Sequence, residues 1–497
     1  MKQIKSALIS VFNKDGLDPI IEELKRLDIT IYSTGGTAKY IEERDGEIVP
    51  VEQLTSYPSI LGGRVKTLHP AVFGGILNRG DVSSDQEELS VHNIPNIDLV
   101  VVDLYPFEDT VASTDNESEI IEKIDIGGVS LIRAGAKNYA DKVIVAHRDL
   151  YTQLLHLLRD QDGKSTMDER KDFAKSAFAV TAHYDKAISG YFNGVKYNHL
   201  RYGENPHQKA RFEGNLDSIL KQLNGKEISY NNLLDIDAAV NLLVDFKRYE
   251  GVMFGILKHN NACGFAVRKS VEKAYADALA GDPVSAFGGI LITNATVTRT
   301  VAEEMHKLFF EVIIAPDYED DALELLKGKK NRIILESKID NLPATQSRTV
   351  LNGTLIQEKD IIVDTRENAK VVSKRQPSDE EVNDMLFANI LVKNTKSNAI
   401  VLVKNQQLLA SGTGQTSRID ALNQAIQKAG VFNFDIQGSV MASDAFFPFP
   451  DCVEIADKAG IVAVIHPGGS IKDQLSIDYC DEHNMSMLMT GHRHFKH

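Results

Sequence analysis

The stretch "NIDLVVVDLYPF" (residues 96–107) is nearly continuously apolar, and Asp103 and Tyr105 follow its central run "LVVV". A strand covered by helices on both faces has this pattern, whereas a strand with one face in water alternates apolar and polar residues. The stretch therefore predicts a buried strand of a parallel sheet. Its two polar residues follow the carboxyl end of that strand, where open α/β sheets bind their ligands.

Strands and helices alternate on both sides of this stretch. "SALISVF" (6–12), "DITIYS" (28–33) and "DKVIVAH" (141–147) predict further strands. "DPIIEELKRLD" (18–28) places four apolar residues on one helical face, and "GTAKYIEER" (36–44) predicts another helix. The alternation predicts an α/β domain with a parallel sheet.

The chain of 497 residues is too long for one core, and its length predicts about two to four domains. Glycines, a proline and aromatic residues interrupt the pattern in "SGYFNGVKYNHLRYGENPHQ" (189–208), so we expect a domain boundary near residues 190–200. Strand patterns return beyond it at "GVMFGILK", "EVIIAP", "NAIVLVK" and "GIVAVIHP". "AVFGGIL" (71–77) and "SAFGGIL" (285–291) are alike but too short to indicate a repeat.

Composition excludes several classes of protein. The formal net charge is −15, whereas a nucleic-acid-binding protein usually has a basic surplus. The apolar runs are much shorter than the ~20 residues of a membrane span, and the first run breaks at Asn13 and Lys14, unlike a signal peptide. Three scattered cysteines indicate a reducing compartment. We expect a cytoplasmic protein without nucleic-acid or membrane partners.

Two glycine-containing loops predict a phosphate site. "STGGTAKY" (33–40) and "SVFNKDG" (10–16) each join a strand to a helix, and free N–H groups at a helix start bind phosphate. Lys14 is a candidate counter-charge. Either loop alone is equally well explained as an ordinary β–α turn, but two at neighbouring strand ends favour one site. Neither fits the dinucleotide fingerprint or the P-loop pattern.

Further candidate groups follow in the same region. "LGGRVKTLHP" (61–70) combines a glycine pair with Arg64 and Lys66, which favours a ligand cradle over simple solvation. "IDIGGVSLIRAGAKN" (124–138) contributes Asp125 and Lys137. A carboxylate, a lysine pair and the phenol of Tyr105 can move protons, although each alone is more often structural.

"LKHNNACG" (257–264) places Lys258 and His259 side by side after a buried strand. His259 and Cys263 have i,i+4 spacing, but no second pair supports a zinc site. The lysine disfavours the imidazolium, so a neutral histidine can accept a proton. The alternative is a structural histidine that forms a hydrogen bond with the backbone.

Other segments offer groups for binding a flat heterocycle, with core packing as the alternative. They are the glycine-broken loops at "SGTGQTSRID" and "HPGGSIKDQ" and the phenylalanines of "SDAFFPFPD".

Taken in order, these segments resemble one family, the bifunctional purine biosynthesis protein, which combines 5-aminoimidazole-4-carboxamide ribonucleotide (AICAR) formyltransferase with inosine monophosphate (IMP) cyclohydrolase. The resemblance runs from "SVFNKDG" to "RHFKH", essentially the whole chain. It implies a methylglyoxal-synthase-like cyclohydrolase domain in residues 1–197. It also implies that residues 198–497 form a transformylase region of two cytidine-deaminase-like α/β units without the deaminase zinc. Family members are homodimers with transformylase sites across the interface.

The resemblance also implies site residues. For ring closure the implied catalytic residues are Lys66, Tyr105, Asp125 and Lys137. The implied nucleotide ligands of the cyclohydrolase are Phe12, Asn13, Lys14, Thr34, Gly35, Gly36, Thr37, Arg64, Val65, Thr67, Val102, Asp103 and Ile126. Lys66 would hold the developing oxyanion, and the other three catalytic groups would transfer protons.

For formyl transfer, the implied general base is His259, beside Lys258. The implied nucleotide ligands are Arg201, Tyr202, Asn232, Gly288, Glu311, Asn398, Arg418, Phe446 and Arg493. The implied folate contacts are Ile419, Asp451, Ser470 and Ile471. The cosubstrate would be 10-formyltetrahydrofolate, with no catalytic metal.

The chain departs from the family pattern at four positions. Ala262 replaces a proline, Asp103 an asparagine, Phe73 a frequent histidine, and Glu311 an aspartate. Two other classes remain as alternatives: a catalytically silent regulatory protein that binds purine nucleotides, and a zinc deaminase, which fold analogy alone suggests. Retention of the catalytic lysines and of His259 favours the bifunctional enzyme.

Overall fold

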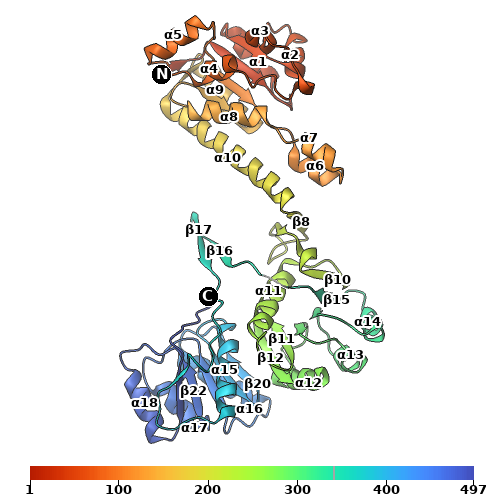
Figure 1. Ribbon diagram of the computed structural model, residues 1–497, viewed down its shortest axis with the longest axis vertical. Helices are drawn as coiled ribbons and strands as arrows, with labels where there is room; N and C mark the ends of the chain where they lie inside the picture. The colour runs from red at the N-terminus through yellow and green to blue at the C-terminus, as the bar shows by residue number, and fades with distance from the viewer. Residues whose placement is uncertain (340–341) are drawn as a thin grey trace. The chain divides into compact units, whose positions relative to one another are not determined.

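The chain forms two units, Met1–Lys196 and Tyr197–His497, in a computed structural model that describes residues 1–339 and 342–497 (Figure 1). We call them the N-terminal unit and the C-terminal unit. The division falls inside the segment in which the sequence predicts a domain boundary.

Five parallel strands form the main sheet of the N-terminal unit, in the order β4-β3-β2-β5-β6. They are β2 (Ser6–Ser10), β3 (Thr30–Ser33), β4 (Val49–Pro50), β5 (Leu99–Val102) and β6 (Val143–Val145). Every residue of β5 is buried, as its apolar run predicts. The predicted parallel sheet is confirmed. A short antiparallel pair, β1 (Lys2–Gln3) with β7 (Lys164–Ser165), lies apart from it.

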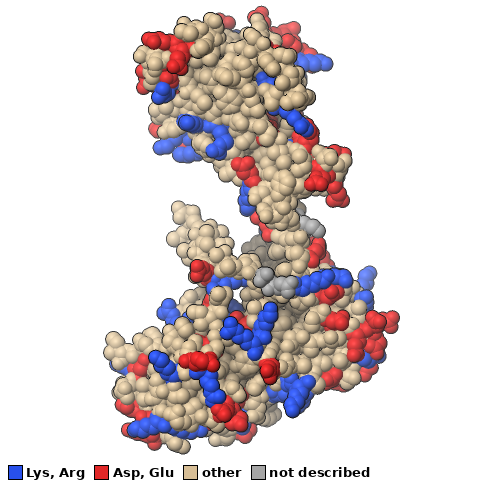
Figure 2. All heavy atoms as spheres, viewed as in Figure 1, with Lys and Arg blue, Asp and Glu red and all other residues tan. Residues whose placement is uncertain are grey.

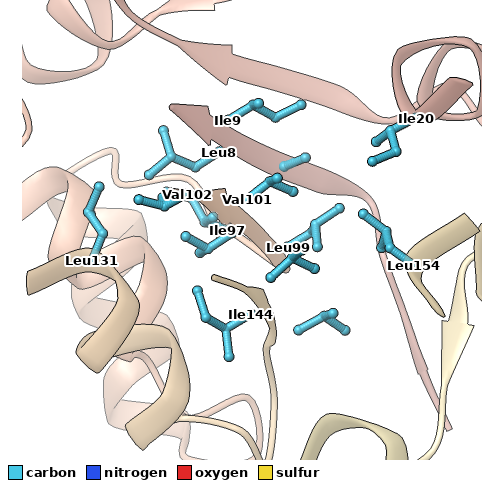
Figure 3. Close-up of a cluster of buried hydrophobic side chains, with 14 of the residues drawn as sticks. Leu8, Ile9, Ile20, Ile97, Leu99, Val101, Val102, Leu131, Ile144 and Leu154 are labelled. Atoms are coloured by element: carbon cyan, nitrogen blue, oxygen red, sulfur yellow. The ribbon is translucent and has the colours of Figure 1, made fainter. Parts of the chain in front are cut away.

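Helices cover this sheet on both faces. Successive residues of a strand point to opposite faces, so the burial of all four residues of β5 shows that both faces are covered. Leu131 and Ile20 pack from two of these helices against the strands (Figure 3). The helices are α1 (Asp18–Arg26), α2 (Gly35–Glu42), α3 (Val51–Thr55), α4 (Pro70–Leu77), α5 (Ser83–Val91), α6 (Phe107–Ser113), α7 (Glu117–Glu122), α8 (Gly127–Lys137), α9 (Tyr151–Asp160) and α10 (Met167–Phe192), with 3-10 turns η1 (Leu61–Gly63) and η2 (Arg148–Leu150).

A mixed sheet of twelve strands runs through the C-terminal unit, in the order β10-β15-β14-β13-β11-β12-β20-β19-β21-β22-β23-β18. The strands of its first half are β10 (Leu220–Asn224), β11 (Val252–Lys258), β12 (Asn261–Arg268), β13 (Ile290–Thr293), β14 (Val312–Ala315) and β15 (Ile333–Ser337). Those of its second half are β18 (Lys370–Val371), β19 (Ile400–Lys404), β20 (Gln407–Gly412), β21 (Val440–Ser443), β22 (Ala463–His466) and β23 (Ser486–Met489).

The two halves of this sheet have the same topology. In each, a helix leads into an antiparallel hairpin, and three parallel strands follow, with a helix before each of them. The helices of the first half are α11 (Tyr230–Asp245), α12 (Val271–Gly281), α13 (Arg299–His306) and α14 (Asp320–Lys327). Those of the second are α15 (Asp379–Lys393), α16 (Arg418–Val431), α17 (Asp451–Lys458) and α18 (Asp473–Glu482). The larger α/β region that the resemblance implies is confirmed.

Strand direction decides which loops of the C-terminal unit meet. The halves join where β12 pairs with β20 in antiparallel fashion, which inverts the direction of one half relative to the other. The amino ends of β13, β14 and β15 therefore lie at the same sheet edge as the carboxyl ends of β21, β22 and β23. We call this edge the shared edge.

Two antiparallel pairs lie outside the large sheet: β8 (Lys196–Leu200) with β9 (Ala210–Gly214), and β16 (Thr345–Val350) with β17 (Gly353–Glu358). Lysine and arginine are interspersed with acidic residues over the face shown in Figure 2. Within the described ranges, the helices are all too short or too polar to cross a bilayer.

Candidate functional site

The carboxyl ends of β2, β3 and β5 border a pocket of about 670 Å3 in the N-terminal unit. The predicted residues that line it are Phe12, Lys14, Thr34, Gly36, Thr37, Arg64, Lys66, Thr67, Val102, Asp103, Tyr105, Asp125 and Ile126. The pocket lies where the sequence places ligands of a parallel sheet. Five segments that are far apart in the sequence, around residues 12, 36, 64, 103 and 125, thus meet at one site.

Other predicted residues lie outside that lining. They are Asn13, Gly35, Val65 and Lys137. Asn13 and Gly35 are next to lining residues and contribute backbone to the same loops. Lys137 is exposed and ends α8, ten residues beyond Gly127, or about 15 Å along the helix axis. Its predicted role in ring closure stays a prediction.

A lysine lies at the amino end of α2. Gly35 has a φ of 56°, and a Cβ atom built on it would lie 2.9 Å from Lys66 Nζ. The first turn of the helix already carries partial positive charge on its free N–H groups. Two positive groups at one point repel each other unless an anion lies between them, so the arrangement favours a phosphate ligand.

Asp103 holds the loop that follows β2. Its carboxylate accepts hydrogen bonds from the backbone N–H groups of Phe12 and Asn13, the latter at 2.9 Å. Burial raises the pKa of Asp103, although these N–H groups and Lys14 oppose the rise. Lys14 Nζ donates to the carbonyl oxygens of Val11 and Phe12, at 2.6 and 2.8 Å. The aspartate that departs from the family pattern thus shapes the loop, in addition to lining the pocket.

Asp125 lines the pocket just before α8, where its Oδ1 accepts from Gly128 N–H in the first turn of the helix at 2.6 Å. Burial raises the pKa of this carboxyl, and burial together with the Asp125 charge raises the pKa of Tyr105. A carboxyl and a phenol with raised pKa values hold their protons more tightly, which suits them to donate and recover a proton during a reaction.

Tyr184 was missed by sequence reasoning. It belongs to α10, and its hydroxyl accepts from Asp125 N–H at 2.9 Å and donates to the carbonyl of Lys123 at 2.6 Å. The hydroxyl therefore fixes the loop that carries Asp125. No local signal points to it, because Tyr184 lies 59 residues from Asp125 in a long amphipathic helix.

Ion pairs and hydrogen bonds occupy several polar side chains of the pocket. Arg64 pairs with Glu122, which lines the pocket too, and both side chains are exposed. Thr34 Oγ1 donates to Glu52 at 2.9 Å, and Thr37 Oγ1 donates to the carbonyl of Val11 at 2.9 Å. These contacts place the backbone of the two predicted phosphate loops around one space.

In the C-terminal unit, Lys258 ends β11 and His259 opens the two-residue turn to β12. His259 and Asn260 both have a left-handed backbone, with φ of 50° and 64°, as in a type I′ hairpin turn. Lys258 Nζ donates to the carbonyl of Phe287 at 2.7 Å, while the His259 side chain is exposed. The imidazole is therefore accessible to a substrate.

Two other predicted residues lie beside this turn. Gly288 has a φ of 69°, and a Cβ atom there would lie 3.1 Å from Lys258 Nζ. Glu311 precedes β14 and pairs with Lys226 at 2.6 Å, a partner that sequence reasoning missed. We call Lys258, His259, Gly288 and Glu311 the Lys-His corner. It lies at the shared edge.

Arg418 begins α16 at the shared edge, where it meets the loop after β21. Its Nε donates to Ser443 Oγ at 3.1 Å and its guanidinium pairs with Asp444 at 3.2 Å. Arg418 and Arg493 lie 6.0 and 4.4 Å from the centre of the Phe495 ring. Phe495, which no motif singled out, thus brings two predicted nucleotide ligands together.

The remaining predicted ligands lie on loops and helix starts. Asn398 donates its amide to the carbonyls of Gln415 and Thr416, at 3.0 and 3.2 Å. Asp451 begins α17, Ile419 follows Arg418 in α16, and Ser470 and Ile471 follow β22. Phe446 is partly exposed and Ile471 is fully exposed. Both offer apolar surface to a ligand.

Arg201, Tyr202 and Asn232 lie near the start of α11. Arg201 is exposed, with its guanidinium 5.7 Å from the Tyr202 ring. Asn232 is buried, and its side chain accepts from Ser229 in the capping box of α11. Its first role is therefore helix capping, and contact with a nucleotide remains a prediction.

One hydrogen bond joins the two halves next to the Lys-His corner. Lys396 N–H donates to Asn261 Oδ1 at 3.0 Å, two residues before Asn398 in the chain. The corner and the predicted ligand Asn398 thus lie in neighbouring segments of the shared edge.

His259 and Cys263, the candidate metal pair, lie in different surroundings, an exposed turn and a buried strand. Cys263 is buried in β12, and burial raises the pKa of its thiol to about 12. Its Sγ donates to the carbonyl of Ile256 at 3.4 Å. In the part of the chain that the structure describes, no group of three or more histidine, cysteine or acidic side chains is arranged to hold a metal ion.

Comparison with known proteins identifies the family. A model of the AICARFT/IMPCHase bienzyme matches residues 135–428, and a model of the MGS-like domain matches residues 16–130. The bifunctional purine biosynthesis protein PurH of Bacteroides thetaiotaomicron is 59% identical over 506 residues, which cover 100% of this chain and 99% of that protein. PurH of Aquifex aeolicus is 45% identical over 512 residues, with 99% and 100% covered.

A solved structure titled "Crystal structure of ForH" is 30% identical, covers 37% of this chain and 97% of its own, and has a TM-score of 0.34. The full-length identity to the two PurH proteins and the bienzyme model agree with each other. The chain therefore belongs to the family of bifunctional purine biosynthesis proteins.

Proposed function

We propose that the two units catalyse consecutive reactions at the end of IMP synthesis. The C-terminal unit transfers a formyl group from 10-formyltetrahydrofolate to AICAR, and the N-terminal unit closes the resulting formyl nucleotide to IMP. Full-length similarity to bifunctional purine biosynthesis proteins supports both activities. The observation that carries the assignment is the Lys-His corner, which lies at the same sheet edge as Arg418 and Asn398.

Formyl transfer needs a base, because the amine of AICAR is weakened by conjugation with its carboxamide. The amine nitrogen attacks the formyl carbon, its proton passes to His259, and the bond from the formyl carbon to N10 of the folate breaks. Lys258 stabilises the oxyanion or protonates the leaving nitrogen. A general base at this position contributes roughly 10²–10⁴-fold to the rate.

The shared edge offers groups for both substrates. Arg418 and Arg493, both close to the Phe495 ring, supply positive charge for the nucleotide. Phe446 and Ile471 supply apolar surface for the folate rings. Every step assigned here uses side chains of this chain and the two substrates, and no metal is required.

Ring closure takes place in the pocket of the N-terminal unit. The nucleotide phosphate binds at the amino end of α2, and the base lies toward Asp125 and Tyr105. In this arrangement Lys66 binds the phosphate, whereas the resemblance implies that it holds the developing oxyanion. The carboxamide nitrogen attacks the formyl carbon, the new ring forms, and water leaves. Because the reaction is intramolecular, holding the two groups in the right orientation supplies much of the rate. Asp125 and Tyr105 exchange the protons that this dehydration requires.

We also propose that the protein is a homodimer of the cytoplasm. All residues of the β16–β17 hairpin are exposed, including Leu355 and Ile356, which are 63% and 72% exposed. An exposed apolar hairpin favours pairing with a second copy. The three cysteines are free thiols, as is usual in a reducing compartment.

A product assay tests this function. Purified protein is supplied with AICAR and 10-formyltetrahydrofolate, and tetrahydrofolate and IMP are measured. We expect both products. Tetrahydrofolate with only formyl nucleotide would place a defect in the N-terminal pocket. Tight nucleotide binding without either product would favour a catalytically silent regulatory protein, and release of ammonia would favour a deaminase.

A further inference from the structure

The turn that carries His259 has a counterpart in the second half of the C-terminal unit. His259 and Asn260 join β11 to β12, and Asn405 and Gln406 join β19 to β20. All four residues have a left-handed backbone, with φ between 50° and 64°. The sequences "KHNN" (258–261) and "KNQQ" (404–407) thus form the same hairpin turn.

The lysine contacts are repeated too. Lys258 Nζ donates to the carbonyl of Phe287 at 2.7 Å, and Lys404 Nζ donates to the carbonyl of Gln437 at 2.6 Å. Phe287 precedes β13 by three residues, and Gln437 precedes β21 by three residues. In both halves the next residue is a left-handed glycine, with φ of 69° in one and 73° in the other.

A helical aspartate binds each turn. Asp235 Oδ1 accepts from Asn260 N–H at 2.6 Å, and the two oxygens of Asp384 accept from Asn405 and Gln406 N–H, both at 2.7 Å. Each aspartate lies six residues after the serine that caps its helix. Left-handed conformations of residues other than glycine cost about 1–3 kcal/mol each, so the aspartates offset a strain that the turns create.

The two copies differ in their reactive side chains. His259 corresponds to Asn405. Glu311 corresponds to Val462. The N–H of each donates, at 3.0 Å, to the carbonyl of the residue that follows the left-handed glycine, which is Gly289 in one half and Ser439 in the other. The second copy therefore retains the turn, the lysine and the aspartate without the groups assigned to catalysis, and it lies at the edge opposite the shared edge.

Asp235 also differs from Asp384 in its hydrogen bonds. Both turn N–H groups are bound to Asp384, whereas among the described residues only Asn260 donates from the turn to Asp235. Burial raises the pKa of Asp235, while the Asn260 N–H and the charges of His259 and Lys258 oppose the rise. The carboxylate thus lies within electrostatic reach of both catalytic side chains.

We propose that Asp235 is a positioning residue for formyl transfer, which fixes the turn that presents His259 and holds a negative charge beside its imidazole. This inference rests on the proposed role of His259 as general base. Among the described residues, the charged side chains that act at the turn are Asp235 from α11 and Lys258 from β11. Lys396 contributes its backbone N–H, which donates to Asn261 Oδ1.

The test compares Asp235→Asn and Asp235→Ala with the matched control Asp384→Asn in the full-length protein. Asparagine keeps an acceptor for Asn260 N–H but removes the charge, whereas alanine removes both. We expect Asp235→Ala to lower kcat for formyl transfer by about 10- to 100-fold with KM within about threefold, because a small displacement of a catalytic group costs that much. Cyclisation of preformed formyl nucleotide, which takes place in the other unit, should be unchanged.

The split between kcat and KM, together with the conservative variant, separates positioning from mere folding. Asparagine keeps an acceptor for the Asn260 N–H, so we expect Asp235→Asn to recover part of the kcat that Asp235→Ala loses. We expect Asp384→Asn to leave kcat for formyl transfer unchanged. An unchanged kcat in both Asp235 variants would overturn the inference, as would loss of folded C-terminal unit in both while Asp384→Asn stays folded.

His259→Ala distinguishes this inference from the function on which it rests. If His259→Ala loses formyl transfer while the Asp235 variants behave as wild type, the general base stands and the positioning role is wrong. If His259→Ala retains formyl transfer, the assignment of the base is wrong, and the role of Asp235 fails with it.

Discussion

His494 Nδ1 lies 2.6 Å from Asp360 Oδ2, and the imidazole is buried near the end of the chain. Its Nε2 lies 3.2 Å from Asp364 Oδ2. Carboxylates only accept hydrogen bonds, so both ring nitrogens must carry protons and the imidazole is charged. Burial opposes this charge, but the two aspartates outweigh it and raise the pKa of His494 to about 9. The network ties the segment that carries Arg493 to the rest of the C-terminal unit.

This ion cluster makes stability depend on pH. The pKa of His494 is raised from an unfolded value of 6.5, so its stabilisation is complete below about pH 6.5 and disappears as the pH rises through about 9. We expect urea unfolding of the C-terminal unit to show a loss on the order of 2–3 kcal/mol between pH 6.5 and 9.5. His494→Gln should abolish most of that difference, whereas the exposed His483→Gln should not. Equal pH dependence in both variants would contradict the assignment.

The two activities should separate by mutation. We expect His259→Ala to lower formyl transfer by about 10²–10⁴-fold and to leave cyclisation intact. Lys66→Ala should do the reverse, since Lys66 lies at the amino end of α2 in the other unit. Separate assays of the two half-reactions measure this. Loss of both activities in a folded variant would refute the model of two sites.

Lys137 offers a sharper test of the cyclohydrolase pocket. It lies outside the pocket lining of its own chain, so we expect Lys137→Ala to lower cyclisation less than Lys66→Ala does. The initial rate of IMP formation from formyl nucleotide measures the difference. An equal loss would show that Lys137 acts on the substrate despite lying outside the pocket lining.

Tyr184→Phe should lower the rate of cyclisation, although Tyr184 does not line the pocket. The change removes a hydroxyl that bonds both Lys123 and Asp125, at 2.6 and 2.9 Å. We expect a loss of about 1–2 kcal/mol in stability of the N-terminal unit, because a partly buried carbonyl and N–H lose their partner. The rate of cyclisation should fall as the Asp125 loop becomes less ordered. Tyr191→Phe, on the same helix but packed edge-on against Phe107, is the control and should change neither quantity.

Asp103→Asn introduces the residue that the family commonly has. The carboxylate accepts from two backbone N–H groups, whereas an amide offers one acceptor oxygen and turns its NH₂ toward the second N–H. We therefore expect the variant to bind formyl nucleotide more weakly and to cyclise it more slowly, measured by calorimetry and by initial rates. Tighter binding of formyl nucleotide would show that asparagine is the better ligand at position 103.

The fold of each segment could be predicted because the relevant signals are local. The apolar run at Leu99–Val102 predicts a doubly covered strand, and the periodicity around Ile20 predicts a helix with one buried face. The two loops predicted to bind phosphate stand out for the same reason, since a strand, one or two glycines and a helix start follow one another within a few residues. The family followed from the order of many such motifs along the chain.

Tertiary structure alone decided which of these residues meet. Tyr184 reaches Asp125 across 59 residues, and Asp235 reaches Asn260 across 25. The antiparallel pairing of β12 with β20 decides that the Lys-His corner and Arg418 share one edge, while the turn at Asn405 lies at the other. The repeat of "KHNN" in "KNQQ" is too short to be seen in the sequence. Local patterns report only interactions between near neighbours, whereas these contacts arise when distant segments close around a common core.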